Sequence, residues 1–244
     1  IPSFLIDSVR KDPQILFNLR NSSIEGFPLG APIDITKRVD LEPFLFQSGY
    51  LTIRGYKKGD KYEYYNLDFR NEQAKNKFFG SFLKNFTGLD PDQVSLDGEG
   101  IKKNLDALDV DAFIGKMYVY ISSIPIELRQ DATLQNYKTI FYLLLENLDL
   151  ETKVEPDSTK VEVSSVTVLF RFTLDKKAET ALERSVKSYK KSISRDKRTY
   201  CVGINFSSES HNIHDWKAEL YNGEEIVQVS HEKQLGGEFK SNNP

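Results

Sequence analysis

Hydrophobic and polar positions follow a helical period over much of the chain. Apolar residues recur three or four positions apart in five segments: 1–20, 74–86, 110–121, 134–148 and 178–193. This spacing predicts amphipathic helices that each bury one face. Pro13 is expected to interrupt the first helix, because proline cannot donate the backbone hydrogen bond of a helix interior. Thr133 is a suitable N-cap for the fourth.

Strand-like patterns appear in both halves of the sequence. Residues 50–56 and 62–69 are joined by Lys57-Lys58-Gly59-Asp60, which predicts a β-hairpin. Three further runs, 160–164, 166–174 and 200–206, are rich in the β-branched and aromatic residues typical of strands. A last strand pair is predicted at 216–221 and 225–229, turned by Asn222-Gly223.

The order of these elements predicts two parts. In residues 1–125 a hairpin lies between helices, an order that resembles a winged helix and is also met in small α+β packing units. In residues 126–244 the order is helix, strand, strand, helix, strand, which predicts an α/β core with helices covering a mixed sheet. The predicted fold class is therefore α+β followed by α/β.

Composition is consistent with a folded protein that has no membrane partner. Of the 244 residues, 39% are hydrophobic and 28% charged, and the net charge is −3. The apolar runs are much shorter than the ~20 residues that a membrane helix needs. The single cysteine, Cys201, excludes an internal disulfide framework, so we expect a reducing, cytoplasmic location. The chain begins at Ile1 without a signal-type segment, and we expect it to be trimmed or one part of a longer polypeptide.

Two segments concentrate charge. Residues 89–112 are acidic but lack the spacing of a calcium loop, so their carboxylates are expected to begin helices. Residues 176–198 carry nine basic and three acidic side chains. Clustered cations are what phosphate contacts require, so Lys187, Lys190 and Lys191 are candidates for binding nucleic acid. The alternative is the solvated face of an amphipathic helix.

Histidine and cysteine offer weaker candidates for chemistry. His211 and His214 are three residues apart, and with His231 they have the residue types of a zinc site. They lie in a turn-rich segment, which favours separate surface histidines, and no metal site is predicted. Cys201 lies in a strand pattern beside Val202, which favours a buried, inert thiol.

Several stretches together resemble one bacterial family. They are FQSGYLTIRGY (46–56), YKTIFYL (137–143), FRFTLDKKAETAL (170–182) and VGINFSSE (202–209), the last followed by Asn212-Ile213 and Asp215-Trp216. In this order they resemble the C-terminal half of bacterial AAA-ATPase-like proteins that carry a PD-(D/E)XK nuclease-superfamily domain. The resemblance spans nearly the whole chain. The phosphate loop of the ATPase half, G-x-x-x-x-G-K-[ST], does not occur in this sequence.

The resemblance implies where a metal site would lie. In that superfamily an Asp on one strand and an Asp or Glu on the next bind a divalent metal, and a Lys lies two residues further on. Here Thr159–Glu162 is the nearest match to the first segment, and Arg171 and Thr173 replace the second carboxylate and the Lys. A Gln often found on the following helix falls at Arg184. A guanidinium at a metal position repels the cation, so the resemblance implies a dismantled centre.

Three functions follow from these observations. The first is a catalytically inactive nuclease-like domain without a cofactor that binds nucleic acid or an ATPase domain. The second is an active, Mg²⁺-dependent nuclease with a rearranged site drawn from Glu155, Asp157, Glu162 and Asp175. The third is a purely structural interaction module.

Overall fold

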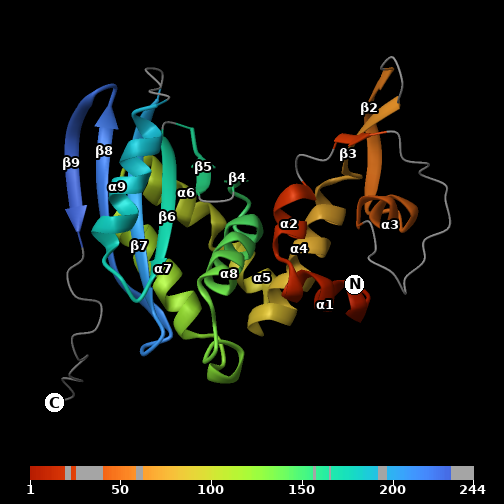
Figure 1. Cartoon of the computed structure of the whole chain (residues 1–244), viewed down its shortest axis with the longest axis horizontal. Coiled ribbons are helices and arrows are strands. Elements are labelled where there is room, and N and C mark those ends of the chain that lie inside the picture. The colour runs from red at the N-terminus through yellow and green to blue at the C-terminus, as the bar shows by residue number, and fades with distance from the viewer. Residues whose placement is uncertain are drawn as a thin grey trace. The chain divides into compact units, whose positions relative to one another are not determined.

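The computed structural model describes residues 1–19, 23–25, 41–58, 63–155, 158–164, 166–191 and 197–231. The chain forms two compact units, residues 1–82 and 83–244. Figure 1 labels the elements of both units.

The first unit combines short helices with a small antiparallel sheet. Its elements are α1 (Ser3–Lys11), α2 (Gln14–Asn18), β1 (Ser23–Glu25), α3 (Leu41–Gln47), β2 (Leu51–Lys58), β3 (Glu63–Phe69) and the greater part of α4 (Glu72–Thr87). The strands lie in the order β1-β3-β2. The ring of Phe69 contacts Phe78 and Phe79, which builds the core between the hairpin and α4. The predicted hairpin and the predicted break near Pro13 are confirmed, whereas Gly59, Asp60 and Tyr62 lie outside the described residues.

The second unit places helices on both faces of a mixed sheet. Its helices are α5 (Pro91–Leu96), α6 (Gly98–Asp106), α7 (Val110–Ser122), the 3₁₀ turn η2 (Ile126–Leu128), α8 (Leu134–Asn147) and α9 (Ala178–Tyr189). Its strands are β4 (Glu151–Glu155), β5 (Ser158–Glu162), β6 (Val166–Leu174), β7 (Arg198–Ser207), β8 (Asn212–Asn222) and β9 (Glu225–His231). They pair in chain order from β4 to β9.

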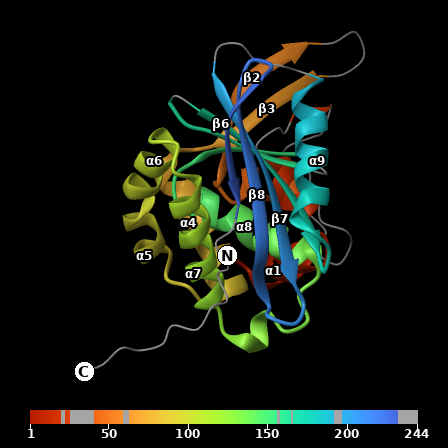
Figure 2. The same ribbon diagram turned by 90° about the vertical axis from the view of Figure 1, so that its left-hand side faces the viewer.

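One parallel pair makes this sheet mixed. Strands β6 and β7 run parallel, because α9 connects them by a crossover, and the other neighbours are antiparallel. Figures 1 and 2 show α9 on one face of the sheet and α7 and α8 on the other. The predicted helix–strand–strand–helix–strand order and its mixed sheet are thus confirmed. Strand β4 is an addition that the pattern did not predict.

Alternation along β6 assigns its side chains to the two faces. Phe170 and Phe172 point toward α8, where both contact the ring of Phe141, and Phe113 of α7 stacks on Phe170. These aromatic rings are buried and form the core of the unit. Side chains at odd positions of β6, such as Arg171, therefore face α9.

Gly203 of β7 fixes the position of α9. A Cβ atom at this residue would lie 2.3 Å from both the Ala178 carbonyl oxygen and the Leu182 backbone nitrogen. The helix backbone thus rests directly on the strand, which only glycine permits. Asp215 of β8 accepts a hydrogen bond from the Ala178 backbone nitrogen (3.0 Å) and so fixes the first turn of α9.

The division between the units lies earlier in the chain than the expected boundary at 125/126. Helices α5 to α7 pack in the second unit, as the contact between Phe113 and the Phe141–Phe170 pair requires.

The prediction for the acidic segment is confirmed at two helix starts. Asp90 caps α5 and Asp109 caps α7 through their carboxylates.

Candidate functional site

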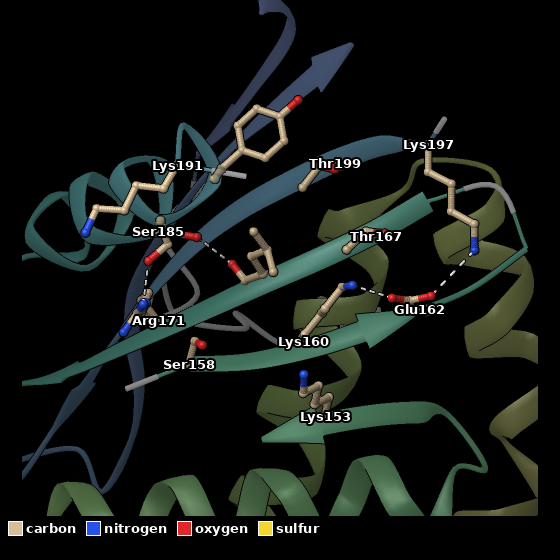
Figure 3. Close-up of a pocket in the computed structure, with 13 residues that line it drawn as sticks. Lys153, Ser158, Lys160, Glu162, Thr167, Arg171, Ser185, Lys191, Lys197 and Thr199 are labelled. Atoms are coloured by element: carbon tan, nitrogen blue, oxygen red, sulfur yellow. Dashed lines mark hydrogen bonds and ion pairs between the residues drawn. The ribbon is translucent and has the colours of Figure 1, made fainter. Parts of the chain in front are cut away.

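A pocket of about 520 Å³ lies over the face of β5 and β6 that α9 borders (Figure 3). We call it the basic pocket. Side chains from four strands, from α9 and from its flanking residues line it: Lys153, Ser158, Lys160, Glu162, Thr167, Leu169, Arg171, Ser185, Ser188, Tyr189, Lys191, Lys197 and Thr199. Its size is within the range of about 300–1,000 Å³ that is usual for ligand sites.

Strand alternation and register bring these residues together. On β5, every second residue from Ser158 to Glu162 faces the pocket, and on β6 every second residue from Thr167 to Arg171 does so. Glu162 pairs with Thr167, and Lys160 with Leu169. The pocket floor is therefore the outward face of one antiparallel strand pair.

Positive charge dominates this pocket. Among the described residues, its lining carries five cationic side chains, from four lysines and Arg171, and one carboxylate, that of Glu162. Serine and threonine hydroxyl groups lie between them. A concave surface with one sign of charge focuses its field and attracts counter-ions. The pocket is thus suited to an anion, although the whole chain has a net charge of −3.

Glu162 lies between two lysine amino groups at one end of the pocket (Figure 3). Its carboxylate contacts Lys160 Nζ directly and is 3.7 Å from Lys197 Nζ. The hydrogen bond from Lys160 lowers the pKa of Glu162 below its usual value, and the positive charges of both lysines lower it further. The carboxylate is therefore charged at neutral pH.

Arg171 lies toward the other end, beside α9 (Figure 3). Its Nη2 donates a hydrogen bond to Ser188 Oγ at 2.6 Å. The neighbouring Ser185 donates to the Leu169 carbonyl oxygen at 2.8 Å, which ties α9 to β6. Arg171 is four residues beyond Thr167 on β6, so roughly 13 Å of strand separates it from the level of Glu162.

The structure brings together two of the four residues that match the nuclease motif. Glu162 and Arg171 line the same pocket, but Glu162 is paired with Thr167 and not with Arg171. Thr173 is buried and donates to Asn205 Oδ1 at 3.2 Å. Arg184 of α9 donates to the Phe172 carbonyl oxygen at 2.8 Å. Thr173 and Arg184 therefore hold the fold around the pocket and do not line it.

The lysines predicted to bind nucleic acid are divided between two surfaces. Lys191 lines the basic pocket and also a second groove of about 740 Å³. Lys187 and Lys190 line that second groove, together with residues of α9, β8 and β9, and are not part of the described lining of the basic pocket. Three glutamates accompany them there: Glu179, Glu183 and Glu219. The second groove is therefore much closer to electrical balance than the basic pocket.

Of the four carboxylates of the alternative nuclease site, the two whose side chains the structure describes, Glu162 and Asp175, lie far apart along β6. Asp175 follows β6 and accepts a hydrogen bond from the Ser208 backbone nitrogen at 2.8 Å. Hydrogen bonding from the Ser208 side chain, and then from its backbone, lowers the pKa of Asp175. Asp157 and the side chain of Glu155 lie outside the described residues. Within the part of the chain that the structure describes, no three His, Cys, Asp or Glu side chains are grouped to hold a metal ion.

The other candidate residues lie on the β7–β8–β9 part of the sheet. His211 is in the turn before β8, His214 is on β8 and His231 ends β9. Cys201 is fully buried in β7, as predicted, and burial raises the pKa of its thiol to about 12. This thiol is thus neutral and shielded at physiological pH.

Several pocket residues were not among the predicted site residues. Lys153 belongs to β4, and Ser158 and Lys160 precede Glu162 on β5. The only sequence signal was the alternation of charged Lys160 and Glu162 with apolar Val161, which is too short to identify a pocket face. Lys197 was counted in the basic segment, but its approach to Glu162 depends on strand pairing.

Comparisons with known proteins add no identification. No protein-family model, curated protein or solved structure matches the chain. The described residues also contain no helix whose length and apolar character would allow it to cross a bilayer.

Proposed function

We propose that this protein is a catalytically inactive, PD-(D/E)XK nuclease-like domain that binds nucleic acid through phosphate contacts, with a winged-helix-like unit before it. The observation that carries the proposal is the basic pocket. Five cationic side chains line it, and one of them, Arg171, is a position that the sequence resemblance assigns to the metal site. Phosphate groups are the anions that such a cluster of lysine, arginine and hydroxyl side chains suits best.

The same residues argue against metal-dependent cleavage. By the resemblance, Arg171 replaces a metal-binding carboxylate, and a guanidinium, which keeps its proton, repels a divalent cation. Thr173, at the position of the lysine, is buried against Asn205 and offers no charge to a reacting phosphate. Loss of a single electrostatic stabiliser commonly lowers a rate by roughly 10²–10³. Binding without cleavage is therefore the activity that this arrangement favours.

The test is binding of a fluorescently labelled single-stranded oligonucleotide, measured by anisotropy over a range of NaCl concentrations. Arg171→Gln with Lys153→Gln removes two charges from the basic pocket. Lys187→Gln with Lys190→Gln removes two from the second groove and is the matched control. We expect the pocket variant to bind more weakly, with a salt slope shallower by about 0.7 for each lost phosphate contact.

Each other outcome has a definite meaning. A larger effect of the Lys187 and Lys190 variant would move the contact to the outer face of α9. Absence of any salt-dependent binding would refute the nucleic-acid proposal and leave an interaction module, for an ATPase domain or another protein. Cleavage with Mg²⁺ or Mn²⁺ that a chelator abolishes would show that the domain is an active nuclease.

A further inference from the structure

Among the described residues that line the basic pocket, one carboxylate, that of Glu162, is held where a ligand phosphate would bind. Glu162 contacts Lys160 and lies 3.7 Å from Lys197, and each of these three side chains is exposed by 35–38%. The group is therefore accessible from solvent and is not a sealed ion pair. Arg171 and Ser188 form a separate donor group nearer α9.

The distance between these groups exceeds the reach of one phosphate. Four residues of β6 separate the level of Glu162 from Arg171, which is roughly 13 Å. A single anion bound at Arg171 thus leaves the contacts of Glu162 with Lys160 and Lys197 unchanged. A ligand with several phosphates reaches both Arg171 and the two lysines. The pocket consequently offers two separate cationic positions, and the protein's own carboxylate fills the one at Lys160 and Lys197.

We propose that Glu162 is a built-in competitor for the phosphates of a bound strand. The first phosphate binds at Arg171, and a later phosphate of the same strand displaces Glu162 from Lys160 and Lys197. This inference deepens the proposed function and rests on it for the identity of the strand. It assigns to Glu162 a regulatory role, which lowers affinity for polyanions in general and favours ligands long enough to occupy both positions.

The position of Glu162 explains why it competes effectively with a ligand phosphate. The carboxylate is tethered beside the two lysines, so its effective concentration there greatly exceeds that of a ligand in solution. Exposed ion pairs are weak and are screened by salt, so a phosphate can replace the carboxylate. The competition should be strongest at low ionic strength and should fade as salt is added.

The experiment compares three variants that each remove one negative charge. Glu162→Gln frees Lys160 and Lys197, whereas Glu179→Gln frees Lys217 from the ion pair between α9 and β8. Asp149→Asn frees Lys102, away from the pocket lining. We expect Glu162→Gln to bind the labelled oligonucleotide roughly threefold to tenfold more tightly at low salt, with a gain that shrinks as salt rises. The two control variants should change affinity less than twofold.

Glu162→Ala also removes the carboxylate and should reproduce the gain, which guards against an effect special to glutamine. Equal gains in all three neutralised variants would reduce the effect to net charge and overturn the proposal. Unchanged or weaker oligonucleotide binding by both Glu162 variants would also overturn the proposal.

Inorganic tripolyphosphate, measured by calorimetry, separates this inference from the proposed function. If the protein binds no oligonucleotide but Glu162→Gln binds tripolyphosphate more tightly than the unmodified chain and both controls, the competitor role stands and the nucleic-acid proposal fails. If oligonucleotides bind and neither probe responds to Glu162, only the competitor role is refuted.

Discussion

Replacement of Gly203 by alanine should displace α9 and so move the residues of this helix that line the basic pocket. The added Cβ would lie 2.3 Å from the Ala178 carbonyl oxygen and from the Leu182 nitrogen, and both are backbone atoms of the α9 segment. A flexible side chain could turn away, but a helix backbone has to move as a whole. Overpacking of this kind costs typically 1–3 kcal/mol, and backbone contacts favour a loss of about 3 kcal/mol.

The movement would also break contacts that position the pocket. Ser185 bonds the Leu169 carbonyl oxygen at 2.8 Å, and Ser188 accepts from Arg171 at 2.6 Å. Both serines belong to α9, so any shift of the helix lengthens both bonds. We therefore expect Gly203→Ala to weaken oligonucleotide binding as well as stability, even though Gly203 does not line the pocket.

Thermal unfolding followed by circular dichroism measures the first effect. A loss of about 3 kcal/mol corresponds to a melting temperature lower by roughly 6–12 °C. The matched control is Gly115→Ala in α7, where an added Cβ meets nothing within 4 Å. Alanine there should stabilise the helix by about 0.5–1 kcal/mol. A Gly203→Ala protein within 0.5 kcal/mol of the unmodified chain would show that α9 does not rest on β7 as described.

Two further predictions concern chemistry. Arg171→Glu combined with Thr173→Lys should not create a Mn²⁺ site, because a carboxylate at position 171 lies roughly 13 Å along β6 from the level of Glu162 and the two cannot share one cation. Calorimetry on the folded variant measures this, and tight Mn²⁺ binding would contradict the register of β5 and β6. Cys201 should resist alkylation in the native protein at pH 8 and react fully after unfolding, because burial raises its pKa to about 12. Rapid native labelling, followed by mass spectrometry, would show that β7 opens.

The sequence predicted most elements of the second unit because their patterns are strong. Apolar spacing identified α8 and α9, and β-branched and aromatic runs identified β6 and β7. Strand β4 was missed, since Glu151–Glu155 is short and lies at a sheet edge with a weak hydrophobic pattern. The boundary at 125/126 differs from the structure because helical periodicity does not reveal which neighbour a helix packs against. The contacts of Phe113 with Phe141 and Phe170 place α7 in the second unit.

The site was harder to predict than the fold because it depends on register. Sequence alignment placed Glu162 with Arg171 at one centre, but the pairing of β5 with β6 places Glu162 opposite Thr167. A difference of four residues along a strand is roughly 13 Å, which is too far for the two side chains to share one metal ion. The same register brings Lys160 and Lys197, distant in sequence, to one carboxylate. Under the proposed function, Arg171 therefore does more than replace a metal ligand, because it adds positive charge to a face of the sheet on which, as we propose, Glu162 competes with the ligand.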